Sequence, residues 1–91
     1  MFAVTRLRVP ADDVPAVTAA VGVLLDALAA RPGFRTGELG RAADDPELLA
    51  LCTIWDGVGA YRRALSAAEV KIAGAPVWLH ALDEPGVYLT D

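Results

Sequence analysis

Hydrophobic residues change their spacing in the middle of the chain. Leu48–Trp55 is an apolar run of strand length, and beyond Asp56 the apolar residues recur at the spacing of a helix. The pattern therefore predicts a buried strand that leads directly into a helix. Trp55 and Tyr61 lie on either side of this junction. A strand that delivers a Trp to a turn, with a Tyr on the next helix, can wall a small aromatic-lined pocket.

The N-terminal part of the chain predicts a strand followed by a helix. Met1–Val9 alternates loosely and is rich in Val, Thr and Phe, as strands are. Val and Leu then recur at helical spacing as far as Arg31, and we expect Asp12 or Asp13 to cap the first turn. Gly22 lies inside this helix, where it costs about 1 kcal/mol relative to Ala. We expect it at a point where the sheet approaches closely.

A hairpin is predicted between this helix and the central junction. Phe34–Ala42 reads as a strand, and Ala43–Pro46 has the composition of a turn. Gly37 and Gly40 weaken the strand and indicate a bend or bulge. The next strand is Leu48–Trp55, so residues 34–55 form the hairpin.

The C-terminal part is read as helix, an ambiguous segment and a last strand. We expect Asp56 to cap a helix from Gly57 to about Ala67, and Ser66–Ala73 to hold a further short helix. A short helix and an extended arm both fit Ala75–Leu82. Val87–Thr90 is a short final strand.

The predicted order is β-α-β-β-α-β, the ferredoxin-like arrangement of the α+β class, over one domain of residues 1–91. A four-stranded antiparallel sheet with its helices on one face leaves the other face bare. Hydrophobic residues make up 55% of the chain, which is more than one small core can hide. We therefore expect a homodimer in which a second copy covers that face.

Charge and cysteine content exclude several classes of function. The net charge is −4 and the arginines are scattered, so no basic stripe exists to neutralise phosphates and nucleic acid is not an expected partner. Cys52 is the only cysteine, which rules out a disulfide framework and a cysteine-based metal site. No apolar run approaches the roughly 20 residues of a membrane span, and the N-terminus does not resemble a signal peptide. We expect a soluble cytoplasmic protein.

Several segments together resemble the antibiotic biosynthesis monooxygenase (ABM) domains. They are VTRLRVP at 4–10, ARPGF at 30–34, GELGRA and DDP within 37–46, TIWDGVGAYRRAL at 53–65 and ALDEP at 81–85. The resemblance spans essentially the whole chain. It implies a dimeric α/β barrel in which two sheets pack face to face and each protomer keeps a pocket between its sheet and its helices.

The resemblance also implies cofactor-free oxygenation of a quinol, anthrone or polyketide-like aromatic through a substrate anion, with no metal or flavin. Trp55 and Tyr61 match the aromatic pair of such members, Trp55 as an N–H donor and Tyr61 as a hydrogen-bonding or proton-relaying group. Two departures are visible. Leu51 stands where those members carry Asn, and residues 73–75 stand where they carry Arg. The alternative is a non-catalytic small-molecule-binding or structural accessory dimer, in which both aromatics are core residues.

Other side chains are weaker candidates for the site. His80, the only histidine, is a candidate general base, and a lone histidine without acidic partners does not predict a metal site. The positions expected to contact a small aromatic ligand are Leu51, Thr53, Arg6 and Glu38. Arg6 is suited to hold an anion at the pocket mouth, and Glu38 is suited to act as a carboxylate base.

Overall fold

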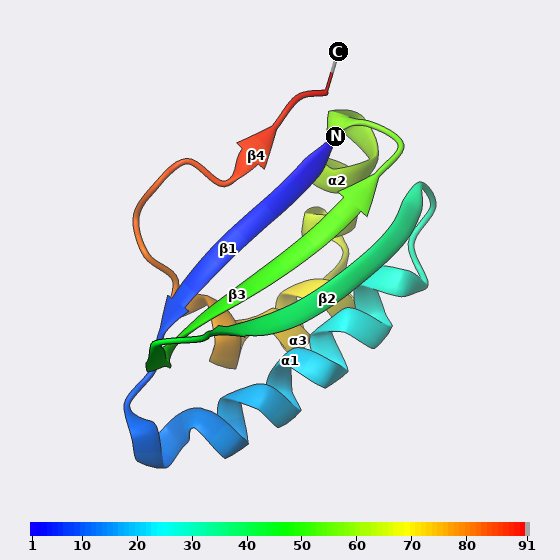
Figure 1. Cartoon of the computed structure of the whole chain (residues 1–91). Helices are drawn as coiled ribbons and strands as arrows, with labels where there is room; N and C mark the ends of the chain where they lie inside the picture. The colour runs from blue at the N-terminus through cyan, green and yellow to red at the C-terminus, as the bar shows by residue number, and fades with distance from the viewer. Residues whose placement is uncertain (91) are drawn as a thin grey trace.

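The structure is a computed structural model that describes residues 1–90. A four-stranded antiparallel sheet forms one layer, and helices cover one face of this sheet (Figure 1). The strands are β1 (Phe2–Arg8), β2 (Phe34–Ala42), β3 (Asp45–Trp55) and β4 (Val87–Tyr88), in the order β2-β3-β1-β4. The helices are α1 (Val14–Ala29), α2 (Val58–Ser66) and α3 (Ala68–Trp78), with a 3₁₀ turn at Ala11–Asp13. The ferredoxin-like α+β fold predicted from the sequence is confirmed.

The core lies between the helices and one face of the sheet. Because side chains alternate along a strand, Leu7 of β1 and Leu49 and Leu51 of β3 share that face, and each is at least 97% buried. The helices contribute Val17, Val21, Leu24 and Leu28 from α1 and Val70 and Val77 from α3. Each fully buried Val or Leu stabilises the fold by about 1.5–3 kcal/mol, so this layer supplies most of the hydrophobic stabilisation.

The other face of the sheet is uncovered. It carries Phe2, Val4, Leu48, Ala50, Cys52 and Ile54, which are half-buried or exposed. Ile54 remains 39% exposed. Phe2 stacks on Tyr88 of β4, with ring centroids 5.2 Å apart and an interplanar angle of 14°. We call this side of the sheet the bare sheet face, and it matches the face expected to need a cover.

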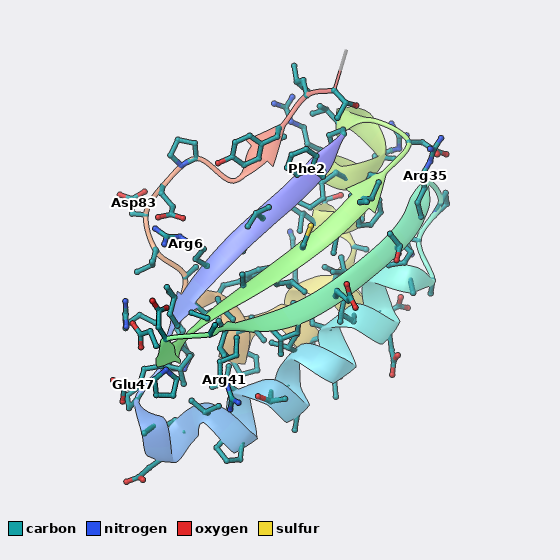
Figure 2. The ribbon with its side chains drawn as sticks, viewed as in Figure 1. Phe2, Arg6, Arg35, Arg41, Glu47 and Asp83 are labelled. Carbon is teal, nitrogen blue, oxygen red and sulfur yellow. The ribbon has the colours of Figure 1, made fainter. Side chains whose placement is uncertain are left out.

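A C-terminal strap, residues 79–88, runs along the edge of β1 that β3 does not occupy (Figure 1). The Leu82 amide donates to the Arg6 carbonyl at 2.9 Å, and the Val4 amide donates to the Gly86 carbonyl at 2.7 Å. The Arg6 guanidinium also donates two hydrogen bonds to the Glu84 carboxylate, at 2.7 and 2.6 Å. Figure 2 shows Arg6 extending from β1 towards the strap. Backbone and ionic contacts together therefore fix the strap to β1.

The structure corrects the sequence prediction for the segment before the strap. Ala68–Trp78 is one continuous helix, with Pro76 inside its last turn, where we expected two separate segments. Proline removes one helical hydrogen bond, to the carbonyl four residues earlier. That residue is Ile72, which is 76% exposed, so water can satisfy its carbonyl and the helix continues.

The predicted caps are confirmed only in position for α1, whose N-cap residue is Asp13, and the cap predicted for α2 is wrong. Neither Asp12 nor Asp13 makes a side-chain hydrogen bond to the start of α1, because a 3₁₀ turn precedes the helix. The N-cap of α2 is Gly57, and the Asp56 carboxylate instead accepts a hydrogen bond from the Arg35 Nε at 2.6 Å. Asp56 therefore ties the start of β2 to the end of β3.

The glycine predictions are also corrected. A Cβ at Gly22 would meet nothing within 4 Å, so the sheet does not approach the helix there. The close approach lies at Gly37, where a Cβ would come within 2.7 Å of a Leu25 methyl group from α1. The register shifts of β2 fall at its two ends, between 34 and 36 and between 41 and 42. Gly37 thus lets α1 pack against the sheet, and the bulges lie elsewhere.

Element boundaries differ modestly from the prediction. β3 begins at Asp45, inside the expected turn, and β4 is limited to Val87–Tyr88. Within residues 1–90, no helix has the length and apolar character to cross a membrane. The cytoplasmic location stays a prediction.

Candidate active site

A cavity of about 430 Å³ lies between β1, α2 and α3. Its lining residues are Thr5, Tyr61, Leu65, Lys71 and Trp78. Thr5 comes from the helix-covered face of β1. Tyr61 and Leu65 come from one face of α2, and Lys71 and Trp78 come from α3. The volume lies within the range of about 300–1,000 Å³ typical of small-molecule sites. This cavity is the candidate site.

Tyr61 gives the cavity a hydrogen-bond donor. Its side chain is half-buried, and its hydroxyl makes no hydrogen bond with any of residues 1–90. Burial raises the pKa of the Tyr61 hydroxyl above its ordinary value, because the phenolate is disfavoured away from water. The group therefore stays protonated at neutral pH and can donate to a ligand oxygen.

Lys71 gives the cavity its positive charge. It is the only lysine of the chain, and no carboxylate lies among the lining residues. The ion pairs found within residues 1–90 all use arginines, so Lys71 has no ionic partner in the described part of the chain. An anionic ligand would therefore meet an available ammonium group at this cavity.

Trp78 forms an aromatic wall, and Gly74 makes room for it. A Cβ at Gly74 would lie within 2.9 Å of the Trp78 Cε2 and 3.0 Å of its Cδ1, so the pyrrole side of the indole lies across the glycine. Lys71, Gly74 and Trp78 follow the i, i+3, i+7 spacing that places residues on one face of a helix. Lys71 and Trp78 therefore line the cavity from the same face of α3.

Trp55 supports the cavity from the core. It is 1% exposed, and its indole N–H donates to the Thr53 hydroxyl at 2.9 Å. Its ring centroid lies 5.6 Å from that of Tyr61 and 5.2 Å from that of Phe34. Trp55 therefore packs behind Tyr61, with its donor already paired, and is not among the lining residues.

Comparison with known proteins places the chain in a family. A family model described as antibiotic biosynthesis monooxygenase (ABM) matches residues 1–75. The chain belongs to the ABM family. Among curated proteins, none matches the sequence.

Solved structures agree with the ABM fold. A conserved protein from Methanosarcina mazei Go1 has a TM-score of 0.78 at 16% identity, over 94% of this chain and 84% of that one. Rv0793 from Mycobacterium tuberculosis has a TM-score of 0.75 at 20% identity, over 94% and 86%. A mutant of SnoaB, described as a cofactor-independent oxygenase from Streptomyces nogalater, has a TM-score of 0.72 at 22% identity, over 89% and 82%. At these identities the likeness shows the fold alone.

The remaining sequence-predicted residues of this ABM chain are dispersed. Leu51 and Thr53 lie in the core, each 3% exposed. Arg6 is bound to Glu84 of the strap, and Glu38 is opposite Cys52 on the bare sheet face. Neither charged group is among the lining residues of the cavity. The structure therefore brings together Tyr61 and Trp55, and it leaves Arg6 and Glu38 on other surfaces.

His80 lines a different cavity, of about 280 Å³, between the first turns of α1 and the end of α3. Its neighbours there include Asp13, Pro76 and Leu79. Within residues 1–90, no group of three or more His, Cys, Asp or Glu side chains is placed to hold a metal ion. The catalytic role of His80 stays a prediction.

The sequence interpretation missed Thr5, Leu65, Lys71 and Trp78. A usable signal was present, because Tyr61 and Leu65 are four residues apart on one helix and Lys71 and Trp78 are two turns apart on the next. The signal was hidden by the expected break before Pro76, which separated Lys71 from Trp78.

Proposed function

We propose that this ABM protein is a cofactor-independent monooxygenase that oxidises a phenolic aromatic of the quinol, anthrone or polyketide-like kind. The observation that carries the proposal is the juxtaposition of Tyr61 and Lys71 in one cavity whose other walls are largely apolar. We propose that the whole chain, residues 1–91, acts as one domain, and that the working form is a homodimer.

The cavity suits a reaction that runs through a substrate anion. The substrate loses a proton to give a phenolate or enolate, whose oxygen accepts a hydrogen bond from the Tyr61 hydroxyl, and the positive charge of Lys71 at the mouth of the cavity favours the anion. No carboxylate or imidazole lines the cavity, so we assign the proton to water at the mouth. Donors placed where negative charge develops favour the anion without any resident metal or flavin.

The electron-rich anion then reduces dioxygen itself. One electron passes to O₂, and the resulting superoxide and carbon radical combine to form a C–O bond in a peroxide. The outer oxygen takes up a proton, the carbon that bears the peroxide loses its remaining proton to water, and the C–H electron pair forms the C=O bond as the O–O bond breaks. The outer oxygen leaves as hydroxide and is protonated to water. For an anthrone-like CH₂ group, the balance is CH₂ plus O₂ giving C=O plus H₂O. Tyr61, protonated at neutral pH, is placed to supply a hydrogen bond or proton to the peroxide oxygen.

Family membership and the SnoaB-like fold support the proposal, since SnoaB is described as a cofactor-independent oxygenase. The bare sheet face supports the dimer, because six side chains of largely apolar character remain without a cover on it. Position 51 is Leu and not the Asn of quinol-oxidising relatives. In this chain Tyr61 and Lys71 alone would therefore stabilise the substrate anion, and in this respect it would differ from those relatives.

The proposal is tested by oxygen uptake with a panel of quinols and anthrones. We expect uptake above the spontaneous rate, and a fall of roughly 10²-fold in Tyr61→Phe and Lys71→Met, the size of effect seen when one oxyanion donor is removed. His80→Gln is the matched control, because His80 lines another cavity and its replacement should leave the rate unchanged. Uptake lost only in His80→Gln would move the active site to that cavity.

Ligand binding separates the enzyme from its alternative. A quinone that binds while no panel member increases oxygen uptake would show a non-catalytic binding protein. Uptake equal to wild type in a Trp55→Phe/Tyr61→Phe double variant would remove both aromatics from the mechanism.

A further inference from the structure

The cavity has a charged side and an aromatic side, both presented by α3. Lys71 and Trp78 lie seven residues apart on this helix and both line the cavity. Lys71 belongs to the exposed residues of the chain, whereas Trp78 is half-buried. The ammonium group therefore stands at the outer end of the cavity, and the indole stands deeper within it.

The Lys71 ammonium at the outer end of the cavity forms no ion pair with the described residues, 1–90. Among the other cations, Arg6, Arg8 and Arg35 each pair with a carboxylate at 2.6–2.7 Å, and the remaining arginines of α2 are absent from the cavity lining. None of these arginines lines the cavity. With no acidic side chain in the lining, the ammonium of Lys71 has only water or a ligand to bind.

Gly74 leaves room for the aromatic side of the cavity. Any side chain there would occupy the space that the pyrrole side of the Trp78 indole fills, at 2.9–3.0 Å from its Cε2 and Cδ1 atoms. The indole is consequently held close along α3, where Trp78 lines the cavity. A planar fused ring is the shape that packs best on such a wall, by offset stacking.

We propose that the cavity selects aromatic acids, planar ring compounds that carry a carboxylate as well as the phenolic oxygen, with Lys71 as the specificity-determining residue. The carboxylate binds Lys71 at the mouth, and the ring lies against Trp78. The inference rests on the proposed function only in using the same cavity. It orients the substrate, with the ring inside the cavity and the carboxylate at the mouth.

Binding of two fully oxidised compounds tests this specificity without any turnover. The probes are anthraquinone-2-carboxylate and the neutral 2-(hydroxymethyl)anthraquinone, titrated by calorimetry and by quenching of tryptophan fluorescence. For wild type we expect the acid to bind about tenfold or more tightly than the neutral compound, as a charge-assisted contact would give. That preference should shrink as salt is added, because Lys71 is exposed.

Variants assign the preference to Lys71. Lys71→Met should abolish the preference for the acid while leaving the affinity for the neutral compound within about twofold, and Lys71→Arg should retain it. Arg62→Met is the control for net charge, because Arg62 is an exposed cation of α2 outside the cavity lining. It should behave as wild type.

The outcomes distinguish this inference from the proposed function. Equal affinities for the two compounds, or a preference that survives in Lys71→Met, would overturn the inference whether or not quinols are oxidised. Failure of both compounds to bind would overturn it as well. Selective binding that depends on Lys71 would uphold it even if no oxygen uptake is ever found, in which case only the oxygenase proposal falls.

Discussion

The indole nitrogen of Trp55 and the hydroxyl of Thr53 form a hydrogen bond of 2.9 Å within one strand. Both side chains are at least 97% buried, so the bond lies inside the core. The polar atom of the largest core residue is thereby satisfied without a ligand. The bond makes Trp55 first of all a structural residue of β3.

Replacing Thr53 with Val should therefore destabilise the protein by about 1–3 kcal/mol, because the Trp55 N–H would remain buried without an acceptor. Urea unfolding followed by tryptophan fluorescence measures the change. Thr53→Ser keeps the hydroxyl and should cost less than the Val variant. A Val variant as stable as wild type would mean that the N–H finds water and that the core at Trp55 is not closed.

Tyr61→Phe should leave the free energy of unfolding within about 0.5 kcal/mol of wild type at pH 7, because its hydroxyl has no partner to lose. At alkaline pH the two proteins should diverge. Burial raises the pKa of Tyr61 in the folded state above its ordinary value of about 10, so the folded protein holds this proton more tightly than the unfolded chain.

The contribution of the Tyr61 proton is complete below pH 10 or so and is lost as the pH rises from there through the raised pKa of the folded state. Wild type should lose stability over this window more steeply than Tyr61→Phe, as measured by urea unfolding at a series of pH values. Parallel curves for the two proteins would place the hydroxyl in water.

Gly74→Ala should destabilise the protein by about 1–3 kcal/mol, as overpacking does, although alanine normally favours a helix. The reason is the Trp78 indole, which occupies the place of the new Cβ. In a Trp78→Ala background the same substitution should become stabilising. Chemical denaturation of the four proteins of this cycle gives the coupling.

Gly22→Ala provides the matched control for Gly74. It lies in α1, and a Cβ there meets nothing within 4 Å, so the substitution should stabilise the protein by about 0.5–1 kcal/mol. If both glycine variants were stabilising, the Trp78 indole would have to move away from Gly74 freely, and Gly74 would not fix its place along α3.

Ile54→Asp should convert the proposed dimer into a monomer, because it puts a carboxylate among the apolar side chains of the bare sheet face. Ile54 lies opposite Phe2 of β1 and Thr36 of β2 on that face. Sedimentation velocity at micromolar concentration measures the change. Ile72→Asp is the control, since Ile72 is 76% exposed on α3 and its replacement should leave the dimer intact. A stable monomer in wild type would contradict the dimer itself.

Most of the fold could be predicted because the spacing of apolar residues changed clearly between elements. Phe34–Ala42 was predicted with the bounds that the structure has, and β1 and α2 differ by one residue at each end. The region after Ser66 was harder, because small residues and Pro76 give α3 no clear period. Its continuity depends on tertiary packing of Val70 and Val77 in the core, which no local pattern shows.

The site was less predictable than the fold for a different reason. β3 is apolar on both faces, so its sequence does not say which face the helices cover. The cover lies on the face of Leu51 and Trp55, and this places Arg6 and Glu38 on the opposite side from the cavity. Tyr61 was recognised from its position after Trp55, whereas Lys71 required the three-dimensional placement of α3.

The two borders of the sheet limit how the protein can aggregate. On one side the strap occupies the hydrogen-bonding groups of β1, and the only strand within the strap is the two-residue Val87–Tyr88. On the other side β2 is nine residues long, but it carries Arg35, Glu38 and Arg41 and is irregular at both ends. Short, charged or irregular borders resist the addition of further strands. Concentrated solutions should therefore not form fibrils by edge-to-edge growth, even though the sheet itself has an apolar surface.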